Sequence, residues 1–147
     1  MAGDSFDLDR FVRAQEGHYA EALSEIRRGH KRSHWMWFIF PQLRGLGSSA
    51  TSVHFGISGV AEAGAYLAHP VLGPRLLECA QAVLSHPDAS ASSMFGYPDD
   101  VKLRSSATLF SRVAADDSPF HRIIDTFFGG EFDQATLRLL EAGGGPT

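Results

Sequence analysis

The sequence predicts an all-α fold: a compact single-domain bundle of about six to eight helices with little or no sheet. Three observations favour this class. Apolar residues recur at three- and four-residue steps through most of the chain, which is the period of a helix that buries one face. No segment shows a convincing run of strict apolar–polar alternation, which a half-buried strand would require. Residue types that cap or end helices stand at the borders of the periodic segments.

The first half of the chain predicts three helices. The first begins at a cap on Asp7, ends at Gly29 and has residues recurring at three- and four-residue steps, namely Phe11, Gln15, Tyr19, Ala22, Leu23 and Ile26. Ser58 and Glu62, with nearly the spacing of a capping box, open a second helix that ends before Pro70. A third covers Val71–Leu84, with a proline tolerated only in its first turn.

The second half predicts three more helices. Pro98 is expected at a first helical position, starting a helix over 99–114 that turns Val101, Ala107, Phe110 and Val113 toward the core. Ser118 caps the next helix, which two glycines close, and Asp133 caps the last. Loops are expected at 45–51, 85–93 and 115–118.

Size and composition suit one globular domain. The 147 residues can bury a sizeable core, and 44% apolar with 20% charged residues is ordinary for such a domain. We expect one helical domain at 6–142, with flexible termini at 1–5 and 143–147.

Charge and cysteine usage exclude several classes of protein. The net charge of −4 argues against a general nucleic-acid binder, which presents a basic surface. The single Cys79 excludes an internal disulfide and is expected to be an inert core thiol. The first nine residues do not resemble a signal peptide, and the longest apolar run is too short to cross a membrane. The expected location is therefore cytoplasmic, without a membrane partner, and the oligomeric state stays open.

Residues 27–47 are the most informative segment. Four of the thirteen cationic side chains (Arg27, Arg28, Lys31 and Arg32) precede both tryptophans, Trp35 and Trp37. Cations beside aromatic surface are typical of phosphate or nucleotide recognition, because they combine charge-assisted hydrogen bonds with stacking. The alternative is structural: basic residues favour a helix C-terminus, and aromatic runs usually fill cores. His34, whose imidazole can donate or accept a proton, and Gln42 are the polar candidates beside the aromatic run.

Residues 97–110 form the second informative segment. It contains Lys102, which is one of only two lysines in a chain with eleven arginines; the other is Lys31 in the first segment. Ser105 lies three positions after Lys102, so that a helix brings both near one face. Asp99 and Asp100 stand at the helix start, where carboxylates are stabilising without any catalytic role. No metal is expected, because the seven histidines are scattered and HExxH is absent.

Five stretches that together span about residues 6–140 carry a family resemblance: RFVRAQEGHYAEAL, GHKRSHWMWFIFPQLRGLGSS, AEAGAYLAHPVLGPRLLEC, FGYPDDVKLRSSATLF and FFGGEFDQATLRLL. They resemble a bacterial family catalogued as domain of unknown function 1810, sometimes labelled calpastatin-like without good reason. The resemblance implies a small all-helical domain and no established activity, substrate or cofactor. The chain departs from the family at Ala107, where methionine is usual, and at His54–Phe55, where tyrosine is common. A fainter likeness, in RAQ…Y…GHK, is to small helical domains that process ADP-ribosyl conjugates.

Three functional hypotheses follow. The first is a pocket that binds an anionic, nucleotide-like small molecule through Lys31, His34, Trp35, Trp37, Gln42, Lys102 and Ser105. The second is a hydrolase acting on a nucleotide or ADP-ribosyl conjugate, with catalytic candidates His34, Lys102, Asp99 and Asp100. The third is a non-catalytic protein-interaction module with an exposed aromatic patch. Against all three stands the interpretation that these residues only stabilise the fold.

Overall fold

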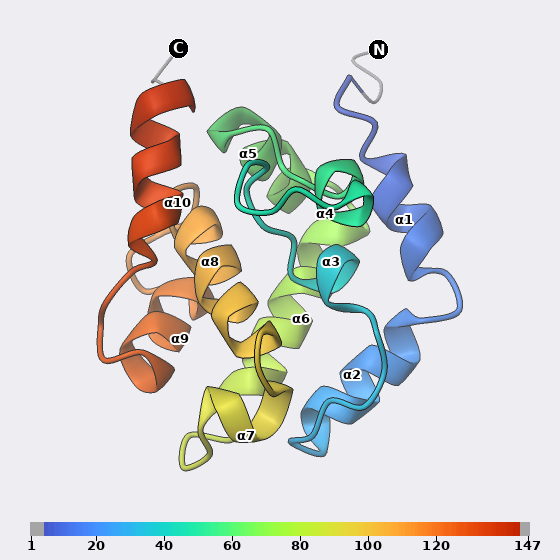
Figure 1. Cartoon of the computed structure of the whole chain (residues 1–147). Helices are drawn as coiled ribbons and strands as arrows, with labels where there is room; N and C mark the ends of the chain where they lie inside the picture. Colours follow the sequence, from blue (N-terminus) through green and yellow to red (C-terminus); the bar gives the residue numbers. More distant parts are fainter. Residues whose placement is uncertain (1–4, 145–147) are drawn as a thin grey trace.

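The computed structural model describes residues 5–144 and confirms the all-helical fold (Figure 1). Within these described residues there are ten α-helices rather than six to eight, followed by a π-helical turn at Leu140–Gly144. The helices are α1 (Asp9–Gln15), α2 (Tyr19–Arg27), α3 (Met36–Ile39), α4 (Ala50–His54), α5 (Val60–Ala68), α6 (Leu72–Leu84), α7 (Ala91–Phe95), α8 (Asp99–Ser111), α9 (Pro119–Phe127) and α10 (Gln134–Leu139). Within the described range, β pairing is limited to one parallel bridge between Leu43 and Ile57. The expected flexible termini fall largely outside that range, at 1–4 and 145–147.

The first predicted helix is in fact two. The chain turns at Gly17, whose φ of +78° is a conformation that favours glycine, and this turn separates α1 from α2. Asp7 does not cap α1, whose N-cap is Leu8 without a side-chain hydrogen bond. The expected end of the segment is confirmed, because α2 stops at Arg27 and Gly29 follows with a φ of +77°.

Several predicted caps are confirmed. The side chain of Ser118 accepts a hydrogen bond from the amide of His121, and that of Asp133 accepts one from the amide of Thr136. The capping box expected at the start of α5 is incomplete. Only the Ser58 amide donates to Glu62, and the N-cap is Gly59. Two predicted loops were wrong in extent, because α4 begins at the end of one and α7 at the end of the other.

The expectation that Val101 lies in the core is wrong, because this residue is 45% exposed. It lies nine positions before Phe110, which is about two and a half turns of helix. The two side chains therefore project from opposite sides of α8. Phe110 is fully buried, so Val101 faces solvent.

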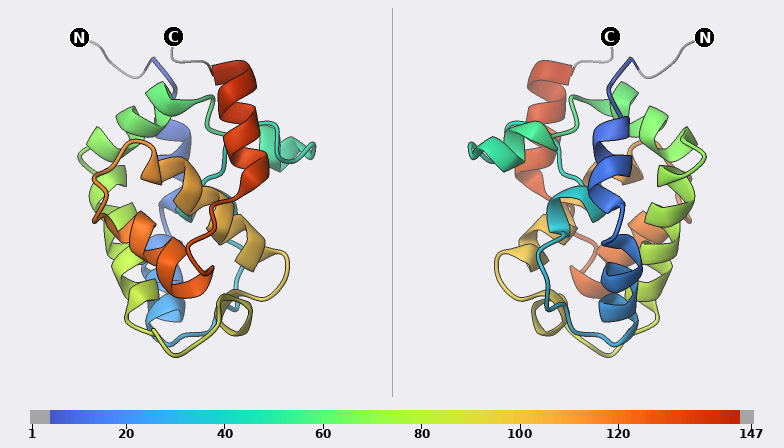
Figure 2. Two further views of the ribbon diagram at one scale, coloured as in Figure 1. Left: turned by 90° about the vertical axis from the view of Figure 1, so that its left-hand side faces the viewer. Right: turned by 90° about the vertical axis from the view of Figure 1, so that its right-hand side faces the viewer.

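Helix α8 holds a central place in the bundle. It packs against α5, α7, α9 and α10, while α6 packs against α2, α5 and α9 (Figure 1). Figure 2 shows α4 standing out from the body beside the C-terminal helix. The buried apolar side chains form one continuous cluster that draws on both halves of the chain. None of the helices within residues 5–144 combines the length and apolar character needed to cross a membrane.

A buried ion pair ties the N-terminal helix to the rest of the bundle. Arg10 on α1 lies 2.8 Å from Glu62 on α5, and both side chains are at most 5% exposed. The same guanidinium donates to the carbonyl oxygens of Phe6, Asp7, His54 and Gly56. The pair cannot be recognised in the sequence, because each residue looks like one charged position on a solvated helix face.

Candidate functional site

A buried carboxylate shapes the segment that connects α2 to α3. Glu25, near the end of α2, accepts hydrogen bonds from the backbone amides of Arg32 (2.7 Å) and Ser33 (3.0 Å). It also accepts from the Ser33 hydroxyl and from Nε1 of Trp35, at 2.5 and 2.9 Å. The chain therefore wraps around one side chain, which holds residues 31–35 in a defined path.

These hydrogen bonds determine the ionisation of Glu25. Burial alone would raise the pKa of this carboxyl, because it disfavours the charged form. The donors from Ser33, the Arg32 amide and Trp35 stabilise the carboxylate and outweigh burial, so its pKa falls from 4.5 to about 2. Glu25 is therefore ionised at neutral pH.

Two lysines from distant segments meet at one aspartate. Lys31 Nζ lies 2.8 Å from Asp99 Oδ2, and Lys102 Nζ lies 3.6 Å from Asp99 Oδ1. The backbone amide of Lys31 donates to the Met94 carbonyl at 2.7 Å, which fixes this segment against α7. The side chain of Lys31 is 7% exposed, whereas those of Asp99 and Lys102 are 20% and 21% exposed. We call these three residues the Lys–Asp–Lys cluster.

Both ammonium groups of the cluster lie over tryptophan rings. Lys31 Nζ is 5.0 Å from the ring centroid of Trp35, and Lys102 Nζ is 4.3 Å from that of Trp37. These distances are typical of cation–π contacts. Trp35 is fully buried with its indole nitrogen bonded to Glu25, and Trp37 is half-buried.

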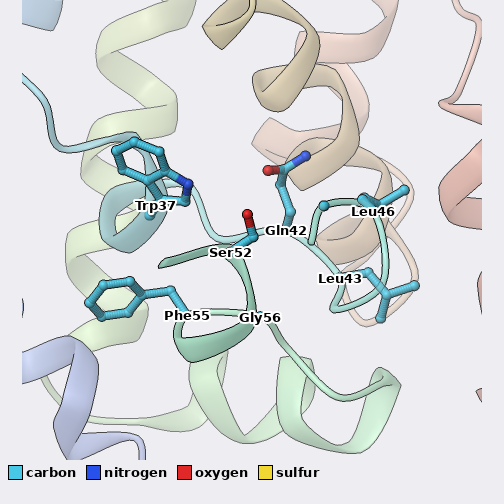
Figure 3. Close-up of a pocket in the computed structure, with 8 residues that line it drawn as sticks. Trp37, Gln42, Leu43, Leu46, Ser52, Phe55 and Gly56 are labelled. Carbon is cyan, nitrogen blue, oxygen red and sulfur yellow. The ribbon is translucent and has the colours of Figure 1, made fainter. Parts of the chain in front are cut away.

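Trp37 also borders a shallow pocket, shown in Figure 3. The pocket has a volume of about 10 Å³, roughly the space of one water molecule, and is lined by Trp37, Gln42, Leu43, Leu46, Gly47, Ser52, Phe55 and Gly56. The indole nitrogen, the Gln42 amide and the Ser52 hydroxyl face the same space (Figure 3). Ser52 shares a hydrogen bond of 2.6 Å with Ser49. Within residues 5–144, Trp37 Nε1 and the Gln42 amide have no hydrogen-bond partner.

The other predicted site residues lie apart from the cluster or do not face it. His34 is exposed and makes no polar or ring contact within residues 5–144. The Ser105 hydroxyl is buried and donates to the Val101 carbonyl at 3.2 Å. Asp100 accepts from the Val101 amide at 2.9 Å.

The basic cluster predicted at 27–32 disperses in the structure. Arg27 pairs with Glu78, and Arg28 and Arg32 are exposed, so only the lysine of the four cations turns inward.

Sequence reasoning missed two buried polar residues near the site. No motif identifies Glu25 or Ser106, because each looks like one polar position of a helix. Ser106 lies on α8 four positions after Lys102 and seven after Asp99, on the same helical face. Its Oγ is buried without a hydrogen-bond partner among the described residues.

The same part of the chain contains no group of three histidine, cysteine, aspartate or glutamate side chains that could hold a metal ion.

Comparison with known proteins gives a family and a fold. A family model described as "Protein of unknown function (DUF1810)" matches residues 5–140. The crystal structure of the conserved hypothetical protein Rv1873 from Mycobacterium tuberculosis is similar, with a TM-score of 0.92 and 50% sequence identity. That match covers 95% of this chain and 99% of the other. No curated protein matches the sequence.

Proposed function

Because the chain belongs to the DUF1810 family, whose description names no activity, we propose a function from the site itself. The protein binds an anionic, nucleotide-like small molecule at the Lys–Asp–Lys cluster and over Trp37. One observation carries this proposal: Lys102 Nζ is held 4.3 Å above the Trp37 ring, beside the ion pair of Lys31 and Asp99.

The charges of the cluster favour an anion. Two ammonium groups and one carboxylate give the three residues of the cluster a summed charge of about +1, in a protein whose net charge is −4. Lys102 Nζ donates no hydrogen bond within residues 5–144, so its three N–H groups are available to a phosphate or carboxylate. Trp37, which lies under Lys102 at the cluster, also lines the neighbouring pocket, where its indole can contact a base or sugar.

The proposal is tested by isothermal titration calorimetry with AMP, ADP-ribose and ribose 5-phosphate. Lys102→Met is expected to weaken binding at least about tenfold, because it removes one charge-assisted contact. Arg122→Met is the control, since it removes an exposed cation from α9. Absence of binding by every ligand, or equal binding by wild type and Lys102→Met, would overturn the proposal.

A second candidate is a hydrolase acting on a nucleotide or ADP-ribosyl conjugate. Asp99 supports it, because this carboxylate lies in the cluster rather than only at a helix start. Asp99 would stabilise positive charge developing on the sugar and accept the proton of the attacking water, while Lys102 would give a proton to the leaving group. Chromatographic assay of product release tests this: Asp99→Asn should abolish turnover. Tight binding without turnover by wild type would leave only the binding function.

A protein-interaction role has less support. Phe40 is 2% exposed, and Trp37 lies beneath Lys102. Among the described residues, the exposed large apolar side chains lie outside the 35–40 block; they are Val53, Val71, Leu77, Tyr97 and Val101.

The proposal also places the protein in the cytoplasm, since Cys79 is a free, fully buried thiol that suits a reducing compartment.

A further inference from the structure

We infer that the Lys–Asp–Lys cluster recognises a sugar hydroxyl, so that the ligand is a ribosyl phosphate rather than a polyphosphate without a sugar. In this arrangement Asp99 accepts a hydrogen bond from a ribose hydroxyl while Lys102 contacts that hydroxyl or the neighbouring anionic group. The inference rests on the proposed function and specifies its ligand class.

The two oxygens of Asp99 have different surroundings. Oδ2 is engaged by Lys31 at 2.8 Å. Oδ1 lies 3.6 Å from Lys102 Nζ, which is too long for a hydrogen bond. Within residues 5–144, Oδ1 accepts no hydrogen bond and Lys102 Nζ donates none. An available acceptor and an available donor therefore lie side by side.

An alcohol hydroxyl satisfies both groups at once. It donates to a carboxylate oxygen and accepts from an ammonium group, whereas a phosphate oxygen of an ionised ester can only accept. The negative charge of Asp99 also opposes the close approach of a polyanion. Because Lys102 lies over Trp37, a sugar held at this donor–acceptor pair would have the indole ring beside it.

The orientation of Asp99 is built into the fold. Lys31 is 7% exposed, its backbone amide is fixed to Met94, and its Nζ also donates to the Ser33 carbonyl at 2.5 Å. Lys31 therefore holds Oδ2, and Oδ1 is left on the side of Lys102 and Trp37. On this basis Lys31 is a positioning residue, and Asp99 and Lys102 are the groups that contact the ligand.

Two matched ligand pairs test the inference by calorimetry on the full chain. They are AMP against 2′,3′-dideoxy-AMP, and ribose 5-phosphate against 2-deoxyribose 5-phosphate. Members of a pair carry the same charge and differ only in hydroxyl groups. Wild type is expected to bind the hydroxyl-bearing member of at least one pair about 10- to 100-fold more tightly, as for one hydrogen bond to a charged group.

Substitution of the acceptor supplies a second readout. In Asp99→Asn, the affinities for the hydroxyl-bearing and the deoxy member of a pair should differ by no more than about threefold. Pyrophosphate should bind this variant more tightly than it binds wild type, because the repelling negative charge of Asp99 is gone. Asp125→Asn, which removes an exposed carboxylate on α9, should change neither quantity.

The outcomes separate the two claims. Equal binding within both pairs by wild type overturns the inference and leaves the proposed function standing, and this comparison needs no variant to fold. Binding by none of the four ligands, together with no binding by ADP-ribose, overturns both. An Asp99→Asn variant that keeps the full preference also overturns the inference.

Discussion

At the scale of single residues, the buried hydroxyl of Ser106 lowers the free energy of unfolding. Its hydroxyl is buried in the face of α8 and has no hydrogen-bond partner within residues 5–144. A buried donor without a partner costs about 1–3 kcal/mol. Ser106→Ala should therefore raise the free energy of unfolding by about 1 kcal/mol in urea denaturation. Ser105→Ala is the control without this gain, since that hydroxyl is bonded to Val101. A Ser106→Ala variant less stable than wild type would contradict this, because it would show that the hydroxyl makes a stabilising interaction.

Glu25 makes stability depend on pH in the acidic range. Its pKa in the folded protein is about 2, against 4.5 ordinarily, so its contribution is complete above pH 4.5 and is lost as the pH falls toward 2. Glu25→Gln should lower the free energy of unfolding by about 3 kcal/mol at pH 7, with a difference from wild type that shrinks below pH 4. Urea denaturation across this range measures it. Glu21→Gln, an exposed change on the same helix, should follow wild type. A difference that is constant with pH would contradict the role of the charge.

At the scale of elements, sequence periodicity predicted most helices because period and capping are local properties. It failed where the local pattern continues through a turn, as at Gly17, and where a helix start faces solvent, as at Val101. The sequence indicated the two segments of the candidate site, residues 27–47 and 97–110. It did not show that the side chain of Lys31 would be buried while those of the neighbouring arginines are exposed. That choice depends on Glu25 and Asp99, which lie elsewhere in the chain.

The junction of α1 and α5 depends on the buried pair of Arg10 and Glu62. Arg10→Met should lower the free energy of unfolding by about 3–5 kcal/mol, because it leaves a buried carboxylate without its counter-charge. The double variant Arg10→Met/Glu62→Leu should recover more than half of this loss, which a double-mutant cycle measures. Arg13→Met, which breaks an exposed pair on the same helix, should cost less than about 1 kcal/mol. A double variant no better than Arg10→Met would assign the effect to the carbonyl contacts of Arg10 instead.

At the scale of the whole molecule, the candidate site exists only where the fold brings residues 31–42 to the start of α8. Trp35 belongs to the continuous core cluster, and Trp37, two residues further along the chain, borders the candidate site. One shared core predicts one cooperative transition for the domain. Tryptophan fluorescence, which reports the site, and far-UV circular dichroism, which reports all helices, should therefore give the same urea midpoint and the same slope, about 1–3 kcal/mol per molar.

The Trp37→Phe variant leaves Trp35 as a single core probe, and its midpoint by fluorescence should again match that by circular dichroism. A fluorescence transition at lower urea would show that the segment around the two tryptophans unfolds before the helices. The Lys–Asp–Lys cluster would then form in a separate and less stable step rather than together with the global fold. In that case a ligand would raise the first midpoint alone, because it binds only the state in which the cluster is formed.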